Sequence, residues 1–362
     1  MTPILPQTMK AAVATGFGEI DGNIFVHTDW PVPSSPPPPG HLVVRVLACA
    51  LAPGDVRVLS GKTDFIQLPE SGHPYVIGSD VSGVVASCHE NETKFQPGDY
   101  VVCRFDEPKP NGGVAEYQLV KAKLTEKCPR SISPIVSCGL PASAMAAKLL
   151  AGYVQPKDRV LVIGGSGAVG SSVIQYVKAA GASYIVAVST QSGLCQSLGA
   201  DRVLNYRVQK PWWQQPDFQK DKFNVVIDLV NGDNWTTGGC SALAVESTGT
   251  YVAAITGVET ELEAHGWTDV IKMILAFMGR MLYSRIHFNL PKWVAPKALK
   301  LEDGDLAELF QDVVKGELKP VMDPSSPFPF TEEGVRQAMH LQQSRHAHGK
   351  VVIQVSDDLN VE

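Results

Sequence analysis

The chain has 362 residues, of which 44% are hydrophobic and 19% charged, and its formal net charge is −6 at pH 7. This length allows two domains with a core each. The negative charge disfavours a nucleic-acid partner, and no apolar run is long enough to cross a bilayer. The seven cysteines are scattered, with no closely spaced pair, and are expected to be free thiols. The first nine residues lack the pattern of a secretory signal, so we expect a cytoplasmic protein.

The first part of the chain, up to about residue 132, is expected to be rich in β-strands and turns. Apolar runs of four to eight residues bounded by glycine and proline indicate such strands. One run, 75–85, carries internal glycines, which predict a strand bent tightly at a barrel-like corner. The sequence of segment 50–61 predicts a tight chain reversal that is followed by a single helical turn. The predicted strands lie within 9–14, 41–48, 75–85, 100–103 and 112–120.

From Ser133 the pattern changes to helices that alternate with buried strands, which predicts a parallel doubly wound sheet. Segment 210–222, which carries Trp212 and Trp213, is expected to be an exposed loop, or else a place where two tryptophans pack at an interface. The expected helices are 142–151, 191–198, 268–283, 306–314 and 331–343. The expected strands are 184–188, 202–206, 224–229, 250–255, 320–322 and 350–355.

The apolar helix 268–283 has three interpretations. Its many large apolar side chains favour packing in the core. A wall of an apolar substrate pocket and a contact in a dimer are the alternatives.

The segment 159–170 carries the strongest motif in the chain. A short apolar strand is followed by Gly165, Gly167 and Gly170, and valines then recur at helical spacing. This strand–turn–helix order is that of a dinucleotide-binding fingerprint. We expect Gly165 to allow the tight turn, Gly167 to let the backbone approach a pyrophosphate, and Gly170 to let the helix pack closely on the strand. The N–H groups and dipole at the helix start would hold the phosphates.

The end of the next strand predicts which dinucleotide binds. A site for NADH usually has an acidic residue there, to bind the ribose diol. This chain has no Asp or Glu between Asp158 and Asp201, and the hydroxyls of Ser189 and Thr190 follow the strand instead. Hydroxyls can donate hydrogen bonds to a 2′-phosphate, which favours NADPH, and Arg207 is a candidate counter-charge. The alternative is an ordinary Ser/Thr turn in an NAD enzyme of loose specificity.

Together these motifs resemble those of the medium-chain dehydrogenase/reductase superfamily, in its zinc-free branch of quinone, alkenal and enoyl reductases. The resemblance covers nearly the whole chain and rests on the segments 9–12, 53–55, 78–83, 112–117, 140–141, 165–170, 198–201 and 349–352. It implies an α/β protein in two domains. A GroES-like, β-rich domain would comprise 1–132 and 298–362, and a Rossmann domain 133–297.

The chain departs from the zinc-binding members of the superfamily. Where those have Gly-His-Glu, it has Gly78-Ser79-Asp80, and the segment around Ala52 has no cysteine where those members have one. A catalytic zinc needs about three protein ligands, and His73 has no partner at ligand spacing. We therefore expect no metal.

The resemblance also implies where a cofactor would lie. The nicotinamide would border the segment at Pro53, the pyrophosphate the glycine turn, and the 2′-phosphate the turn after Val188. The adenine would lie near Tyr206, and two short segments would close over the nicotinamide ribose. The expected cofactor contacts are Pro53, Gly54, Asp55, Gly165, Ser166, Gly167, Ala168, Val169, Gly170, Ser189, Thr190, Ser192, Tyr206, Ala254, Ile255, His348 and Gly349. Two departures, Ala52 for Asn and Ala146 for Thr, remove polar groups near the nicotinamide.

Without a Lewis acid, such a site could still pass hydride from NADPH to an electrophilic carbon of a small apolar enone, enal or quinone. The proton would come from solvent or from a tyrosine, with Tyr75, Tyr117 and Tyr283 as candidates, although the sequence favours a structural role for each of them. Two alternatives remain. One is an enoyl reductase that acts in trans on an acyl chain bound to a carrier protein, in partnership with a synthase. The other is a non-catalytic NADPH sensor or partner protein. A homodimer is expected from the resemblance.

Overall fold

The computed structural model describes residues 5–62, 72–105, 112–230, 232–235, 240–254, 265–296 and 304–361. The chain forms two compact units, the first made of Met1–Ala142 and Leu301–Glu362 and the second of Ser143–Lys300. These two units are defined by the contacts between residues. The domain boundaries predicted after residues 132 and 297 stay predictions.

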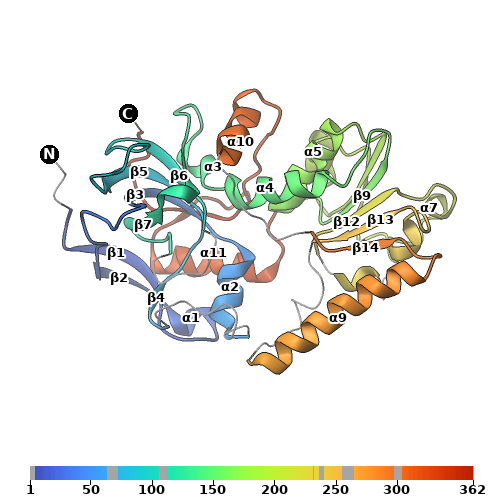
Figure 1. Cartoon of the computed structure of the whole chain (residues 1–362), viewed down its shortest axis with the longest axis horizontal. Helices are drawn as coiled ribbons and strands as arrows, with labels where there is room; N and C mark the ends of the chain where they lie inside the picture. Colours follow the sequence, from blue (N-terminus) through green and yellow to red (C-terminus); the bar gives the residue numbers. More distant parts are fainter. Residues whose placement is uncertain are drawn as a thin grey trace. The chain divides into compact units, whose positions relative to one another are not determined.

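The first unit is built mainly of strands, and it uses both ends of the chain (Figure 1). Its strands are β1 (Thr8–Ala14), β2 (Ile24–Pro31), β3 (His41–Ala50), β4 (Tyr75–Val76), β5 (Val81–Cys88), β6 (Tyr100–Cys103), β7 (Tyr117–Lys121), β8 (Thr125–Lys127), β15 (Phe328–Pro329) and β16 (Val352–Gln354). Its helices are α1 (Ile20–Asn23), α2 (Pro53–Ser60), η1 (Ala122–Leu124), α3 (Pro134–Ser137), α10 (Asp305–Val314) and α11 (Glu332–Ser344). Helix α4 (Leu140–Ala151) begins in this unit and ends in the second.

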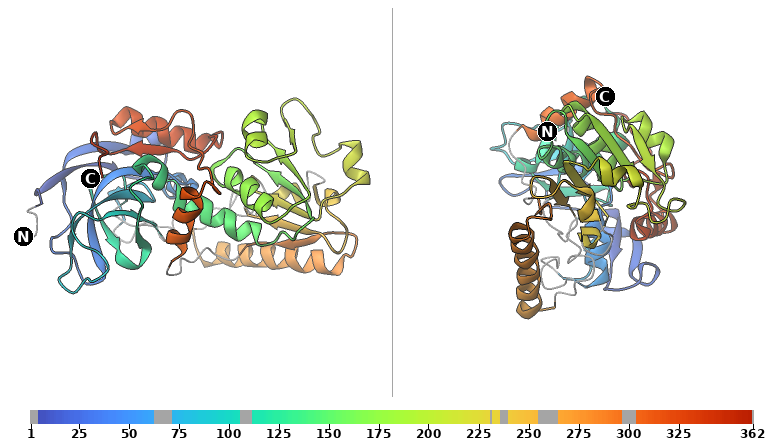
Figure 2. Two further views of the ribbon diagram at one scale, coloured as in Figure 1. Left: turned by 90° about the horizontal axis from the view of Figure 1, so that it is seen from above. Right: turned by 90° about the vertical axis from the view of Figure 1, so that its right-hand side faces the viewer.

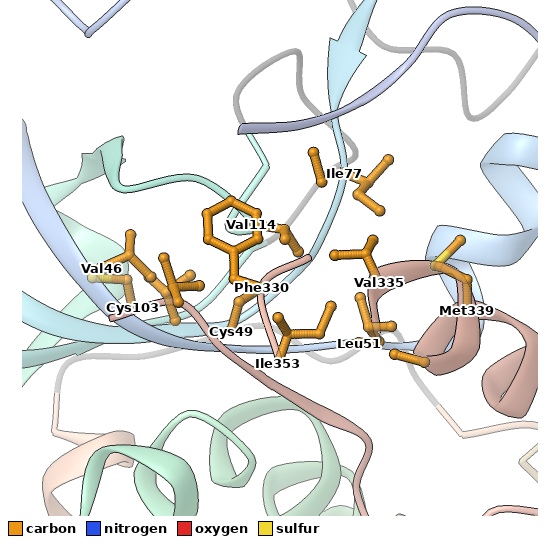
Figure 3. Close-up of a cluster of buried hydrophobic side chains, with 14 of the residues drawn as sticks. Val46, Cys49, Leu51, Ile77, Cys103, Val114, Phe330, Val335, Met339 and Ile353 are labelled. Atoms are coloured by element: carbon orange, nitrogen blue, oxygen red, sulfur yellow. The ribbon is translucent and has the colours of Figure 1, made fainter. Parts of the chain in front are cut away.

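Two sheets organise the first unit. One has the strand order β2-β1-β4, and the other has the order β15-β16-β3-β5-β6-β8, with β7 also paired to β3. The C-terminal strand β16 pairs antiparallel with β3, so that Ile353 lies opposite Cys49. This pairing brings residues far apart in sequence into one apolar core. Figure 3 shows Phe330, Val335 and Ile353 from the C-terminal part of the chain among side chains from β3.

The second unit has the parallel sheet that the sequence predicts. Its strand order is β11-β10-β9-β12-β13-β14, and every pairing in it is parallel. The strands are β9 (Arg159–Ile163), β10 (Tyr184–Val188), β11 (Arg202–Leu204), β12 (Val225–Asp228), β13 (Thr250–Ala253) and β14 (Lys292–Val294). The helices are α5 (Ala168–Ala179), α6 (Ser192–Ser197), α7 (Pro216–Lys220), η2 (Gly232–Trp235), η3 (Cys240–Leu243) and α9 (Trp267–Ile286). The α/β fold class with a GroES-like unit and a Rossmann-like unit is therefore confirmed.

Some local predictions were wrong. The bent strand expected over 75–85 is two strands in different sheets, β4 and β5, separated by residues 77–80. Strand β2 was not predicted at all. Segment 210–222 is not simply an exposed loop, because it contains α7 and because Trp212, which is 7% exposed, packs in the core of the second unit.

The apolar helix over 268–283 exists as α9, but the prediction that it packs in the core was wrong. Among the described residues of α9, only Ser284 is buried. The helix runs alongside the edge strand β14 as one continuous rod in the views of Figures 1 and 2. Most of its large apolar side chains face outward.

Candidate active site

The glycine turn between β9 and α5 lies at the centre of the parallel sheet, because β9 pairs with both β10 and β12. Its left-handed residue is Gly164, with φ of +89°. This corrects the expectation that Gly165 makes the tight turn. A Cβ on Gly165 would instead lie 2.9 Å from Ala187 Cβ on β10, so Gly165 is needed for close contact with the neighbouring strand.

Gly170 and Gly167 have different surroundings. A Cβ on Gly170 would lie 2.1 Å from the carbonyl oxygen of Gly164, so the helix could not keep its present distance from the turn. A Cβ on Gly167 would meet nothing nearer than 3.6 Å, again at the oxygen of Gly164. The chain itself therefore leaves room beside Gly167. An approaching pyrophosphate would need that room, which fits the expected role of this glycine.

Helix α5 presents its N-terminus at this turn. Gly167 is its N-cap and has no side chain to bond the first N–H groups. The first bond made to the cap carbonyl is from the Ser171 N–H to the Gly167 oxygen, at 2.9 Å. The N–H groups of the first helical turn have no intrahelical acceptor, and they lie at the positive end of the helix dipole. The arrangement fits a bound phosphate group.

The hydroxyls after β10 are not equivalent. Ser189 is only 2% exposed, and its Oγ accepts a hydrogen bond of 3.0 Å from the Gln191 N–H. The bond holds the turn, and the burial of the side chain leaves Ser189 poorly placed to meet a cofactor. Thr190 is half-buried and Ser192 is exposed. Of the three predicted hydroxyls, Thr190 and Ser192 are those open to a ligand.

Tyr206 and Arg207 follow β11, the strand that pairs with β10. Both are exposed, and the Arg207 N–H bonds Asn205 Oδ1 at 3.0 Å. Within the part of the chain that the structure describes, the Arg207 guanidinium has no ion pair. Arg207 is therefore a cation without an ion pair among the described residues, in the turn that follows β11, the strand paired with β10.

Sequence reasoning missed Asp228 as a site residue, although it ends a buried apolar strand, β12. The side chain is fully buried. Its Oδ2 accepts hydrogen bonds from the Tyr251 hydroxyl at 2.8 Å and from Asn234 Nδ2 at 3.2 Å, and its Oδ1 accepts one from the Val230 N–H at 3.0 Å. Asp228 thereby ties the segment that follows β12 to strand β13. Ala254, one residue beyond β13, donates its N–H to the Asp228 carbonyl, and Ile255 lies outside the described residues.

In the first unit, Asp55 closes the first turn of α2. Its Oδ2 accepts hydrogen bonds from the Ala52 N–H at 2.7 Å and from Ser79 Oγ at 2.9 Å. Desolvation raises the pKa of Asp55, whereas these two bonds and the charge of Lys350 lower it. Pro53 and Gly54, at the start of the helix, are exposed. The positions that correspond to zinc ligands in the superfamily thus take part in a hydrogen-bonded cap.

Asp80 and Lys350 form a second buried feature, next to Asp55. Both are almost fully buried. Asp80 accepts hydrogen bonds from the Phe105 N–H at 3.1 Å and from the Ala142 N–H at 2.9 Å, so it caps the first turn of α4. Desolvation raises the pKa of Asp80, while the charge of Lys350 and these N–H donors lower it. The positive charge of Lys350 therefore offsets the negative charge of two buried carboxyl groups, those of Asp55 and Asp80.

Gly349, which precedes Lys350, has φ of +115°, and a Cβ there would lie 2.7 Å from the Val321 oxygen. It belongs to a tight turn beside 321–323. His348 is half-buried and donates its N–H to Asp323 Oδ2 at 2.7 Å.

The three candidate tyrosines lie in different places. Tyr75 is buried, its hydroxyl has no hydrogen-bond partner in the described chain, and burial raises its pKa. Tyr117 is half-buried on β7. Tyr283 is exposed on α9, where its ring packs against Trp235 and His287. The structure does not gather the three tyrosines in one place.

Among the residues that the structure describes, no group of three or more His, Cys, Asp and Glu side chains could hold a metal ion. No helix in the described part of the chain is long and apolar enough to cross a membrane.

Comparison with known proteins establishes the family. Residues 38–130 match the alcohol dehydrogenase GroES-like domain, and residues 198–353 match the family described as zinc-binding dehydrogenase. The chain is 30% identical to the chloroplastic NADPH-dependent alkenal/one oxidoreductase of Arabidopsis thaliana, over 96% of this chain and 80% of that protein. It is 28% identical to the mitochondrial NAD(P)H oxidoreductase RTN4IP1 of Danio rerio, over 88% and 85%.

A solved structure shares the fold of this chain. The quinone oxidoreductase of Coxiella burnetii superposes with a TM-score of 0.77 at 21% identity, over 96% of this chain and 99% of that one. The chain therefore belongs to the medium-chain dehydrogenase/reductase superfamily, in its branch of quinone and enoyl reductases. The resemblance inferred from the motifs is confirmed, and the protein is an oxidoreductase of this class.

The two glycines of the turn give a matched test of the phosphate site. Gly170→Ala should lower the melting temperature and abolish NADPH binding, because its Cβ collides with the Gly164 oxygen. Gly167→Ala should fold with nearly unchanged stability but weaken NADPH binding by roughly 10-fold or more, since a methyl group would occupy the space left for phosphate. Thermal unfolding and fluorescence titration measure both. Equal loss of stability in both variants would contradict this account.

The charge cluster gives a pH-dependent prediction. Lys350→Met should destabilise the protein by roughly 1–3 kcal/mol at neutral pH, because two buried carboxyl groups lose their nearby cation. Their folded-state pKa values should rise further. A group with a raised folded pKa binds protons that the unfolded chain has already released, so stability falls as pH rises toward that pKa.

Melting temperatures of the wild type and the variant, measured between about pH 5 and pH 8, test this. The melting temperature of Lys350→Met should fall further below that of the wild type as pH rises. This difference should shrink when Asp80→Asn is added. The exposed Lys315→Met is the matched control and should follow the wild-type curve. Parallel curves for Lys350→Met and the wild type would contradict the role assigned to Lys350.

Proposed function

We propose that the protein is a zinc-independent reductase that uses NADPH to reduce the activated double bond of enones or enals, or to reduce quinones. The observation that carries this is the pairing of a complete phosphate-binding turn with a polar, acid-free segment after β10. The alkenal/one oxidoreductase of Arabidopsis thaliana, named for its dependence on NADPH, supports the cofactor and the substrate class.

The 2′-phosphate of NADPH would bind between the turn after β10 and the start of the segment after β11. Thr190 and Ser192 would donate hydrogen bonds, and the exposed Arg207 would supply the charge. Ser189 is left out of this set, since its side chain is buried. The pyrophosphate would rest on the first N–H groups of α5 beside Gly167.

Zinc independence is proposed from the residues at the metal-ligand positions. Ser79, which stands where zinc-binding members have histidine, donates its hydroxyl proton to Asp55. Ala52 has no ligating side chain, and its N–H bonds the same carboxyl group. This donor set supports backbone capping and gives a metal too few ligands.

When bound, NADPH supplies a hydride from its nicotinamide ring. The chain's own contribution is to hold the phosphates, orient the ring and keep water away from the acceptor carbon. Addition of hydride to the β-carbon of an enone places negative charge on the carbonyl oxygen, and a proton from solvent or from a tyrosine completes the saturated ketone. Tyr75 remains a candidate donor, since its buried phenol stays protonated at neutral pH. The cytoplasmic location stays a prediction.

Cofactor preference can be tested at Arg207. Arg207→Ala should weaken NADPH binding by roughly 10- to 100-fold while leaving NADH binding unchanged, because only the 2′-phosphate loses a charged partner. Ser189→Ala is a matched change in the neighbouring turn and should retain the preference for NADPH. Fluorescence titration with both cofactors measures the ratio. A wild-type protein that binds NADH more tightly would contradict the proposal.

Substrate class can be tested by following NADPH oxidation as a small enone, an enal and a quinone are added in turn. We expect turnover with at least one class, and we expect it to persist after treatment with a chelator. Loss of turnover on metal removal, restored by zinc, would contradict zinc independence. Tight NADPH binding with no oxidation of NADPH by any of the three would favour the carrier-bound substrate or the non-catalytic sensor.

A further inference from the structure

The carboxyl group of Asp228 is buried beside the glycine turn, and the proposed hydride transfer makes no use of it. Asp228 ends β12, where it lies opposite Ile163, the last residue of β9. In the sheet, β12 lies between β9 and β13 (Figure 1). The Leu229 N–H bonds the Ile163 carbonyl oxygen at 3.1 Å. The chain that leaves β12 therefore starts next to the chain that enters the glycine turn.

Three hydrogen-bond donors from different segments meet on this carboxyl group. They are the Tyr251 hydroxyl on β13 at 2.8 Å, Asn234 Nδ2 in η2 at 3.2 Å and the Val230 N–H at 3.0 Å. All three donors are neutral groups. A carboxyl group can be kept in a buried position when its oxygens are satisfied in this way. Asp228 thus serves as a common acceptor for the segment after β12 and for the neighbouring strand.

Two neighbours of the carboxyl group stay protonated at neutral pH. Burial, followed by the charge of Asp228, raises the pKa of the Tyr251 hydroxyl, and the same two causes raise the pKa of the Cys240 thiol. An ionised carboxyl group can only accept hydrogen bonds. The Tyr251 hydroxyl therefore donates its proton to Asp228 throughout the neutral pH range.

The bond to the Val230 N–H turns the chain immediately after β12. An Asp side chain that accepts from the N–H two residues later closes a local turn of the Asx type. The turn brings Val230 against Gly164, since a Cβ on Gly164 would lie 2.8 Å from Val230 Cγ2. Val230 is itself 46% exposed. Packing therefore holds Val230 only weakly, and the hydrogen bond to Asp228 is what fixes its backbone.

Gly164 is the residue of the turn on which the phosphate site depends. Its φ is +89°, and its carbonyl oxygen accepts the Gly167 N–H at 3.2 Å. The same oxygen limits how closely Gly170 of α5 can approach. Displacement of Val230 would leave Gly164 less confined, and the first N–H groups of α5 would shift with it. A line of direct contacts thus leads from Asp228 to the phosphate turn.

We propose that Asp228 is a positioning residue of the cofactor site, which holds the chain after β12 against Gly164 and so fixes the turn that receives the pyrophosphate. In this role Asp228 touches neither cofactor nor substrate, and acts through Val230. The proposal rests on the NADPH-dependent reductase proposed above. Because NADPH and NADH share the pyrophosphate, loss of Asp228 should weaken both cofactors equally, whereas loss of Arg207 should affect NADPH alone.

Fluorescence titration of the full chain with NADPH and with NADH tests the proposal. Asp228→Asn keeps the shape of the side chain but replaces one acceptor oxygen by a donor, so the three donors can no longer all be satisfied. It should raise the dissociation constants of both cofactors by the same factor, roughly 10-fold or more. Tyr251→Phe removes one donor from a fully buried residue and should raise both constants roughly 3-fold or more.

The opposite edge of the same sheet offers matched controls. The carboxyl group of Asp201 also accepts a backbone N–H, from Ile185 at 2.7 Å, but Asp201 lies just before β11. Tyr184 is the first residue of β10, at that same edge. Asp201→Asn and Tyr184→Phe should therefore bind NADPH and NADH as tightly as the wild type does.

A double variant tests whether Asp228 acts through Val230. Val230→Ala removes the methyl groups that cover Gly164 and should weaken both cofactors. If the two residues act along one route, Asp228→Asn combined with Val230→Ala should bind hardly more weakly than the weaker-binding single variant. Losses that multiply in the double variant would overturn this route.

Melting temperatures measured without cofactor separate binding from folding. Folded Asp228→Asn and Tyr251→Phe proteins that bind both cofactors as the wild type does would overturn the proposal, even with lowered melting temperatures, because the network would then only stabilise the fold. Weakening confined to NADPH would also overturn it. If Asp228→Asn does not fold, Tyr251→Phe decides by the same criterion. A wild type that binds NADPH without oxidising it would contradict the reductase and leave this test intact, since binding is measured without substrate.

Discussion

The cofactor site depends on one close approach, that of α5 to the turn that follows β9. The helix begins so near the Gly164 carbonyl that only glycine fits at position 170. The same approach aims the first N–H groups of α5 at the space beside Gly167, where a phosphate group can be held without a charged side chain. The remaining specificity then comes from neighbouring strands, from the hydroxyls after β10 and from Arg207 after β11. A single packing contact thus positions the part of the site that is common to NADH and NADPH.

The first unit is held together by a different kind of interaction. Lys350, from the C-terminal segment, offsets the buried carboxyl groups of Asp55 and Asp80 from the N-terminal segment. Those carboxyl groups in turn cap the starts of α2 and α4. Burial of three charged groups is costly, so this cluster contributes little stability by itself. Its effect is to fix which backbone segments meet at the positions where zinc-binding relatives carry their metal ligands.

The sequence predicted the fold class, the parallel sheet and the phosphate turn, because each has a strong local pattern of apolar runs and glycines. It did not predict that Gly164 makes the turn, since a positive φ has no signature where three glycines lie so close together. It did not distinguish Ser189 from Thr190 and Ser192, because the sequence alone does not record which hydroxyl in a turn is buried. The exposure of α9 was not the favoured prediction for a similar reason: an apolar helix has the same sequence pattern whether or not it packs in the core of its own chain. The role of Lys350 depends on contacts between the two ends of the chain, which no local pattern records.

The most direct test of the proposed reductase chemistry follows the hydride itself. The protein is treated with chelator and given an enone together with NADPH that carries deuterium at C4 of the nicotinamide, on one face or the other. The account predicts that one of the two labelled cofactors delivers deuterium to the β-carbon of the saturated ketone, as read by mass spectrometry. Product that carries no deuterium from either cofactor, or label transfer that requires added zinc, would contradict it.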